Sequence, residues 1–180
     1  MHYQYSYEKD YLSEFTDSGE ALEKLETGVD RAVLSTDDPS VYRYDQMDTN
    51  SSENSSMQMG TNSTAYYFSV ASSSIANFFD EMYLNTPWEQ HYNNLDGRTI
   101  LDRLASVKYF VVKKGKESDL PYGYSRLSGE AEKNGKTYQA YADEDALPLG
   151  YTYDSWISRE DYDKMTMTEK QQALLQGVVL

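Results

Sequence analysis

Acidic residues stand next to each other at several points of this 180-residue chain, and paired carboxylates are the groups on which a glycosidase depends. Such an enzyme holds two carboxyl groups across a cleft and raises the pKa of one of them. The chain has 30 acidic residues, so adjacent pairs are unavoidable, and we interpret them as solvated faces, turns and helix starts. An acid-dependent hydrolase that uses two of them remains an alternative. The runs are Asp37–Asp38, Asp80–Glu81, Asp143–Asp145 and Glu160–Asp161.

One motif resembles a phosphate-binding loop only in part. Residues 135–137 read Gly-Lys-Thr, but Glu130 stands where that loop needs a glycine. The residues that follow alternate as in a strand, whereas the loop should lead into a helix. Asn134 with Gly135 is the preferred pair for a type I′ turn, so the sequence predicts a β-hairpin here.

Metal and cofactor sites have little support in the sequence. His91 stands near Glu89 and Asp96, but the chain has only 2 histidines and no His-x-x-x-His pair. The absence of cysteine excludes disulfides, thiolate zinc sites and a cysteine nucleophile. The sequence therefore predicts no catalytic residue, no cofactor and no metal ligand, and His91 is interpreted as a structural or surface residue.

Aromatic residues are the best candidates for ligand binding. The chain has 18 tyrosines, whose rings pack against apolar groups while their hydroxyls stay in water. A sugar-stacking surface is predicted at Trp88, Trp156, Tyr151 and Tyr153, with packing in the core or at its rim as the alternative. The net charge of -14 argues against nucleic acid as a partner, because phosphate binding needs clustered Lys and Arg. A glycan is the ligand class that the sequence favours.

Strands must position these residues, and their patterns indicate one mixed sheet with helices packed on it, which is the α/β (α+β) class. The continuous apolar run in 107–114 predicts a central strand. Short strand patterns also cover 31–36, 55–60 and 124–129. The sheet is expected to contain 41–44, 65–68, 108–112, 137–142 and 150–154.

Helices are indicated by apolar spacing and by capping residues. They are predicted over 19–26, 72–82 and 98–106, with two more near the C-terminus. Ser158 with Asp161 and Thr166 with Glu169 predict the starts of these last two. The residues expected to face inward are Leu22 and Leu25; Ile75, Phe78, Phe79 and Met82; Leu101 and Leu104; and Ala173 and Leu174.

Several segments, taken in order, resemble the YfhO-like multi-pass membrane proteins of bacteria. In that family a Tyr/Phe-Ser-Ser segment precedes a helix, and a Leu-Asp-x-Leu segment leads into a Val-Lys-Tyr strand. An Ala-Leu-Pro-Leu-Gly-Tyr block and a helix ending near Lys-Gln-x-x-Leu-Leu-x-x-Val follow. The matching positions here are Phe68-Ser69 through Asn77, 101–104, 107–109, 146–151 and 170–179, with Val70 and Ala71 interrupting the first block.

This resemblance implies an extracytoplasmic domain of a larger membrane protein that is similar to C-type glycosyltransferases. Those enzymes use a polyprenyl-phosphate-linked sugar and decorate surface polymers such as the teichoic acids of Gram-positive bacteria. The resemblance places the catalytic acid in an early membrane loop outside this chain, so the role here would be accessory, such as positioning an acceptor.

The same resemblance implies the partners and the division of the chain. The membrane-embedded part of the same parent chain would be one partner, and a cell-surface glycan or polymer the other. We expect a helical lead-in over 1–30 and a soluble domain on the extracytoplasmic face of the cell membrane over 31–180. A cell-wall glycan-binding module that uses the Trp and Tyr surface remains the alternative.

Overall fold

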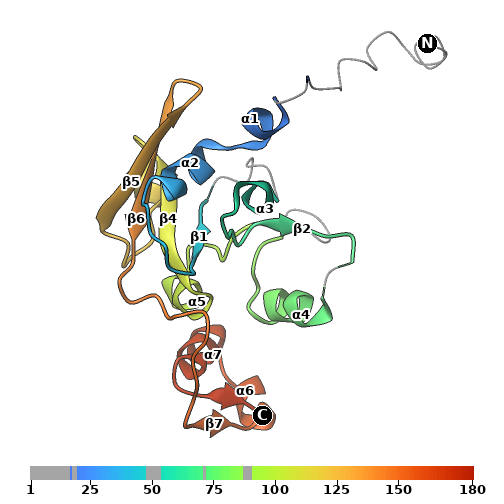
Figure 1. Cartoon of the computed structure of the whole chain (residues 1–180). Helices are drawn as coiled ribbons and strands as arrows, with labels where there is room; N and C mark the ends of the chain where they lie inside the picture. The colour runs from blue at the N-terminus through green and yellow to red at the C-terminus, as the bar shows by residue number, and fades with distance from the viewer. Residues whose placement is uncertain (1–16, 18–19, 48–53, 71, 87–90) are drawn as a thin grey trace, which may run out of the picture.

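The computed structural model describes residues 17, 20–47, 54–70, 72–86 and 91–180 (Figure 1). Within these residues no helix is long and apolar enough to cross a membrane. The helices are α1 (Ala21–Leu25), α2 (Gly28–Leu34), α3 (Ser55–Met59), α4 (Ser73–Glu81), α5 (Thr99–Leu104), the 3₁₀ helix η3 (Glu117–Asp119), α6 (Arg159–Asp163) and α7 (Met167–Leu174). The strands are β1 (Arg43–Asp45), β2 (Tyr66–Tyr67), β3 (His91–Tyr92), β4 (Val107–Lys113), β5 (Arg126–Lys133), β6 (Lys136–Ala142), β7 (Trp156–Ile157) and β8 (Val178–Val179).

A four-stranded mixed sheet in the order β1-β4-β6-β5 forms the centre of the molecule (Figure 1). Strand β1 runs parallel to β4, and the other neighbours are antiparallel. Strand β4 is an inner strand, as its apolar run predicted, because side chains on both of its faces are buried. Tyr109 and Val111 face one core, and Phe110 and Val112 face the other. The predicted α/β class with a mixed sheet is confirmed.

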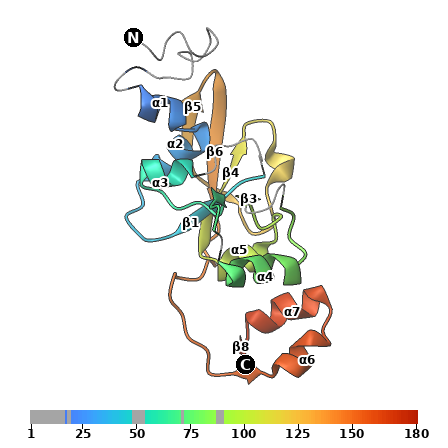
Figure 2. The ribbon, with the colours of Figure 1, turned by 90° about the vertical axis from the view of Figure 1, so that its right-hand side faces the viewer.

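Helices cover both faces of this sheet. Helix α2 packs so closely on β5 that a Cβ atom at Gly129 would lie 2.4 Å from the carbonyl oxygen of Ala32. The opposite core is built by Phe79 of α4, Leu101 of α5 and Tyr162 of α6. Helix α5 contacts both the sheet and α7. The C-terminal helices α6 and α7 therefore lie below the sheet (Figures 1 and 2).

Local signals correctly predicted one turn and two helix starts. Asn134 and Gly135 both have positive φ, 53° and 69°, as a type I′ turn requires, and they join β5 to β6. The Ser158 hydroxyl accepts a hydrogen bond from the backbone of Asp161, and α7 begins with the full capping box of Thr166.

Two segments that were predicted as strands are helical. Most of 31–36 belongs to α2, which begins with a capping box between Thr27 and Asp30. This capping box starts the helix before residue 31. One apolar face of α2 then packs toward the sheet. In the segment 55–60, Ser55–Met59 form α3, and Gly60 caps the helix in a left-handed conformation with a φ of 71°.

Two other predicted strands lie outside the central sheet. Strand β2 pairs with β3 in a separate two-stranded sheet, so 65–68 does not join the central one. Residues 150–154 form no strand. In this segment the hydroxyls of Tyr151 and Tyr153 donate to carbonyl groups at the ends of two helices, which holds the chain away from a sheet edge.

The predicted inward faces hold for the middle helices, except at Ile75 of α4, and fail at the N-terminus. Leu22 and Leu25 are exposed, because α1 is a single short turn with no buried residue. Ile75 is also exposed. The division into 1–30 and 31–180 stays a prediction, since residues 1–16 lie outside the described part of the chain. Phe79, Met82 and Leu101 are buried, and Phe78, Leu104, Ala173 and Leu174 pack half-buried against the same core.

Candidate functional site

Trp156 is the predicted stacking residue with the most open ring. It lies in β7, whose parallel partner β8 pairs it with Val178. The residue is 66% exposed, so its indole is available to a ligand although its backbone is paired within the two-stranded sheet. An exposed indole presents a wide apolar face of the kind on which a sugar ring stacks. Trp88, the second predicted indole, lies outside the described residues.

Tyr151 and Tyr153 meet each other just upstream of Trp156. Their ring centroids are 5.4 Å apart in an edge-to-face arrangement. The Tyr151 hydroxyl donates to the carbonyl oxygen of Leu104 at 3.2 Å, and the Tyr153 hydroxyl donates to that of Leu174. Burial and the hydrogen bond with Tyr151 raise the pKa of Tyr153 to about 12. The two phenols therefore connect the ends of α5 and α7.

The predicted stacking residues thus divide into two kinds. Among the described residues, no ring contact joins Trp156 to either tyrosine. Both tyrosine hydroxyls have structural partners, whereas the indole of Trp156 lies open to solvent. A ligand would meet Trp156 first, and the tyrosines set the course of the chain that leads to it. The role of these residues in glycan binding stays a prediction.

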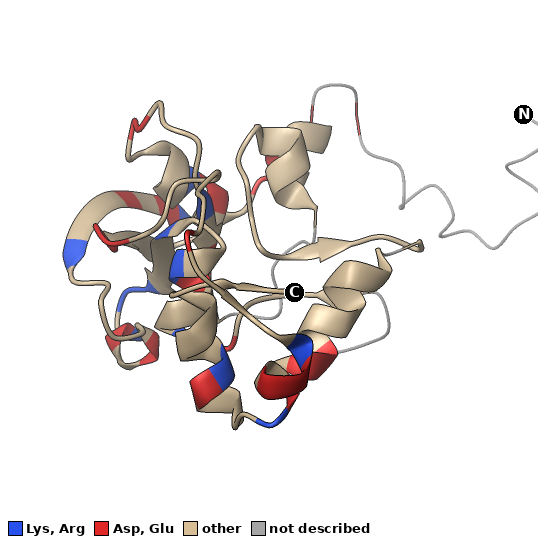
Figure 3. Ribbon diagram, turned by 90° about the horizontal axis from the view of Figure 1, so that it is seen from below, with Lys and Arg blue, Asp and Glu red and all other residues tan. Residues whose placement is uncertain are grey.

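The adjacent acids that the sequence highlights are mostly engaged in ion pairs between elements. Asp143 receives two hydrogen bonds from Arg103, the shorter at 2.7 Å. Glu81 pairs with Arg159 of α6 at 2.6 Å, and Asp38 pairs with Lys108 of β4. Figure 3, in which the molecule is seen from below, shows Lys and Arg positions interspersed with Asp and Glu positions along the ribbon. These acids are therefore engaged in contacts within the protein.

Asp38 shows how strongly such a contact acts on one acid. Partial burial alone would raise its pKa, but hydrogen bonds from Lys108, Ser40 and Tyr109 outweigh that effect. The pKa of Asp38 therefore lies well below its usual range. The carboxylate stays charged at neutral pH and ties the segment before β1 to β4.

A carboxyl pair that the sequence did not indicate lies inside the molecule. Asp45, at the end of β1, is 1% exposed, and Asp102 of α5 is 0% exposed. Asp45 accepts hydrogen bonds from the backbone of Gln46 and Leu95 and from the Thr64 hydroxyl at 2.7, 3.0 and 2.8 Å. Among the described residues, no donor reaches either carboxyl oxygen of Asp102.

Burial sets the protonation of this pair. It raises the pKa of both carboxyl groups, and repulsion from Asp45 raises that of Asp102 further. Asp102 is therefore a neutral acid at pH 7, while the three hydrogen bonds of Asp45 favour its carboxylate. Neither group is exposed, so no substrate can reach the pair. In the sequence, the only sign of this buried pair is that Asp102 lies among the inward-facing residues of α5.

His91 makes an aromatic contact within the small sheet. It lies in β3 and stacks on the Tyr67 ring, with centroids 4.4 Å apart. Within the described ranges, no group of three or more His, Asp or Glu side chains could hold a metal ion.

Comparison with known proteins gives one family. The family model for "Bacterial membrane protein YfhO" matches residues 1–180. Among curated proteins, the chain is similar to "Uncharacterized protein YfhO" of Bacillus subtilis (strain 168), with 27% identity over 153 residues. That alignment covers 83% of this chain and 17% of the relative, so the chain spans about a sixth of the relative's length. No solved structure matches the chain.

Proposed function

Because the chain belongs to the YfhO family of bacterial membrane proteins, we propose that it is the extracytoplasmic accessory part of a membrane glycosyltransferase. In this proposal the parent protein transfers sugar from a polyprenyl-phosphate carrier to a teichoic-acid-type polymer of the cell surface. The described part does no chemistry of its own. It holds the acceptor glycan near the membrane-embedded part of the same parent chain.

The exposed indole of Trp156 is the observation that carries this proposal. It stands at the lower end of the molecule, in β7, away from the central sheet (Figure 1). Neighbouring contacts hold the segment before it in place, since two tyrosine hydroxyls bond to the ends of α5 and α7. An aromatic face on a fixed segment contacts a sugar ring at low entropic cost.

The way in which the acids of this chain are used supports the proposal that the chain does not catalyse the transfer. The Asp45 and Asp102 carboxyl groups are closed to solvent, and Asp143 is engaged by Arg103. We expect the purified chain to transfer no sugar from a lipid-linked donor, whereas membranes that contain the parent protein do so. Transfer by the purified chain alone would contradict the accessory role.

Tryptophan fluorescence tests the glycan contact, because the chain has only 2 tryptophans. In a Trp88→Phe variant the emission comes from Trp156 alone. Titration with neutral oligosaccharides should change that emission with a dissociation constant in the millimolar range, on the order of -4 kcal/mol. The matched control is Trp156→Phe, in which the response should vanish. A response that survives in Trp156→Phe would place any glycan contact elsewhere.

A further inference from the structure

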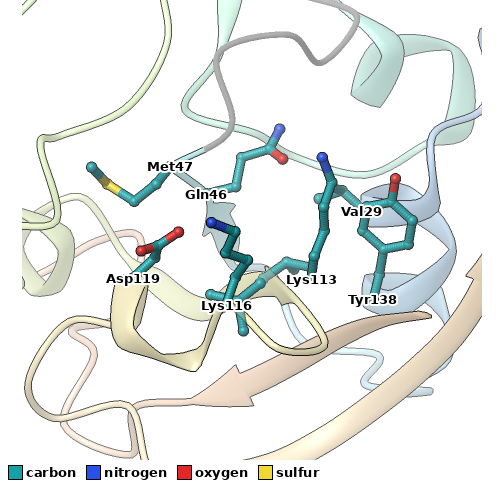
Figure 4. A pocket seen from close by; sticks show the side chains of 9 residues that line it. Val29, Gln46, Met47, Lys113, Lys116, Asp119 and Tyr138 are labelled. Atoms are coloured by element: carbon teal, nitrogen blue, oxygen red, sulfur yellow. The ribbon is translucent and has the colours of Figure 1, made fainter. Parts of the chain in front are cut away.

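A pocket of about 270 Å³ opens where β1 and β4 end side by side. Its walls come from α2, the end of β1, the turn after β4, and β6. This volume is near the lower end of the range for small-molecule sites, roughly 300–1,000 Å³. Ligands often bind beyond the carboxyl ends of parallel strands, which is where this pocket lies. The lining includes Val29, Gln46, Lys113, Lys116, Asp119 and Tyr138 (Figure 4).

Gln46 supplies a hydrogen-bond acceptor without a partner. The residue is 5% exposed, and its Oε1 atom accepts no hydrogen bond within the described part of the chain. A buried amide oxygen without a hydrogen-bond donor destabilises the fold, and a donor group from a ligand would offset that cost. Figure 4 shows the Gln46 amide facing the same space as the Lys113 and Lys116 side chains. The ligand should therefore carry a hydroxyl or N–H group on this side.

Positive charge gathers at the same pocket, although the chain as a whole has a charge of -14. Lys113 and Lys116 stand on one tight turn, held by a hydrogen bond from the Lys116 N–H to the Lys113 carbonyl at 2.9 Å. The Lys113 ammonium also lies 5.9 Å from the centroid of the Tyr138 ring. Asp119 is the acid among the lining residues that the structure describes. Lysine ammonium groups are point charges suited to phosphate and carboxylate.

From this combination we infer a binding site for a small hydroxylated anion, meaning a short polyol that carries a phosphate or a carboxylate group. The two ammonium groups bind the anionic end, and the Gln46 oxygen accepts a hydrogen bond from a hydroxyl. Val29 and the Tyr138 ring cover the carbon chain. The site is separate from Trp156, because β4 begins next to α5 and the C-terminal helices while the pocket lies at its other end.

Calorimetric titration of the whole chain tests the chemistry of the ligand. Low ionic strength is used because salt would screen the charge of the exposed Lys116 side chain. Glycerol phosphate and glycerate are the two anionic polyol probes. Glycerol tests for binding without charge, and inorganic phosphate tests for binding without the hydroxyl chain. We expect at least one polyol anion to bind with a dissociation constant of about 1 mM, and both glycerol and inorganic phosphate to bind at least about fivefold more weakly.

Two variants locate the binding in this pocket. Lys116→Gln should weaken the polyol anion about fivefold or more. Lys114→Gln makes the same charge change on the same turn but lies outside the lining, so it should stay within about twofold of the parent. Gln46→Met removes the acceptor at similar size and should weaken the polyol anion but not inorganic phosphate. Thermal unfolding of each variant checks that it is folded.

Several results would overturn the inference. These are no binding of either polyol anion at tens of millimolar, equal effects of the two lysine variants, or equal affinity for inorganic phosphate and the polyol anions. Tighter binding of an amino acid such as serine than of either polyol anion would also overturn it. Trp156→Phe should leave this titration unchanged, so failure here is distinguishable from failure of the glycan contact at Trp156.

Discussion

The central sheet and the C-terminal segment of this chain are held together by different means. The sheet body, defined as α2 with β1, β4, β5 and β6, has apolar side chains buried on both faces. The C-terminal lobe, defined as residues 151–180, contains one buried apolar side chain, Tyr162. Its links to the rest of the molecule include half-buried apolar side chains such as Ala173 and Leu174, ion pairs of Arg159 and Lys170 with Glu81, and the Tyr151 hydroxyl.

This difference has an energetic consequence. Burial of apolar side chains stabilises a fold in proportion to area, by roughly 25 cal/mol per Å². An exposed ion pair or a cap adds only about 1 kcal/mol. The lobe should therefore open at a lower cost than the sheet body and exchange its amide hydrogens faster.

Phe110→Ala should have the largest effect, because its ring is fully buried between the sheet and the helices below it. We expect a loss of about 3–5 kcal/mol in the free energy of unfolding. Leu104→Ala, at a half-buried position, should cost about 2 kcal/mol. Denaturant unfolding measures both losses. A loss below about 0.5 kcal/mol at Phe110 would mean that the core does not lie where β4 places it.

The same contrast explains what the sequence could predict. The caps at Ser158 and Thr166 and the turn at residues 134–135 depend on neighbours within a few positions, so they were predicted correctly. Residues 31–36 contain a short apolar run that suits a strand or a helix. The box between Thr27 and Asp30 and the close packing of α2 on β5 decide for the helix.

The candidate site was less predictable, because it depends on contacts between distant segments. Asp45 and Asp102 meet only because β1 lies beside β4 and α5 packs below, which no local pattern indicates. Tyr151 and Tyr153 alternate as in a strand, but their hydroxyl partners lie on α5 and α7. The exposure of Trp156 could not be predicted from the sequence either, because a tryptophan next to an apolar residue is equally typical of a buried core.

Asp102→Asn should change how stability depends on pH. Burial raises the pKa of both Asp45 and Asp102, so above pH about 4 the folded state keeps a proton that the unfolded state has released. The free energy of unfolding should therefore fall as the pH rises, by about 1–3 kcal/mol between pH 6 and pH 9. Asparagine is neutral at every pH, so this variant should lose most of that decline.

Denaturant unfolding at several pH values measures this effect. Asp154→Asn is the matched control, because it removes one acid from an exposed position of the lobe and should keep the decline of the parent. Equal slopes in Asp102→Asn and the parent would show that the buried pair does not hold the proton. Asp38 acts in the opposite sense, since its lowered pKa makes stability fall only in strong acid.

Tyr153→Phe should loosen the lobe by a smaller amount. It removes the hydroxyl that donates to the Leu174 carbonyl and leaves the ring in place. We expect a loss of about 1 kcal/mol, seen as faster amide exchange in α7 and unchanged exchange in β4. Tyr151→Phe is the comparison, because its bond to Leu104 ties the same segment to α5. Equal acceleration in β4 would mean that the lobe and the sheet open together.

Trp156→Ala should have the smallest effect on stability and so separates function from architecture within the lobe. Because the indole is 66% exposed, its removal should change the free energy of unfolding by less than about 0.5 kcal/mol. Differential scanning calorimetry of this variant and of Tyr153→Phe compares an open ring with one fixed by a hydrogen bond. A loss above about 1 kcal/mol in Trp156→Ala would mean that the indole packs against the fold. It would then belong to the structure of the lobe, and the glycan contact proposed for it would lose its support.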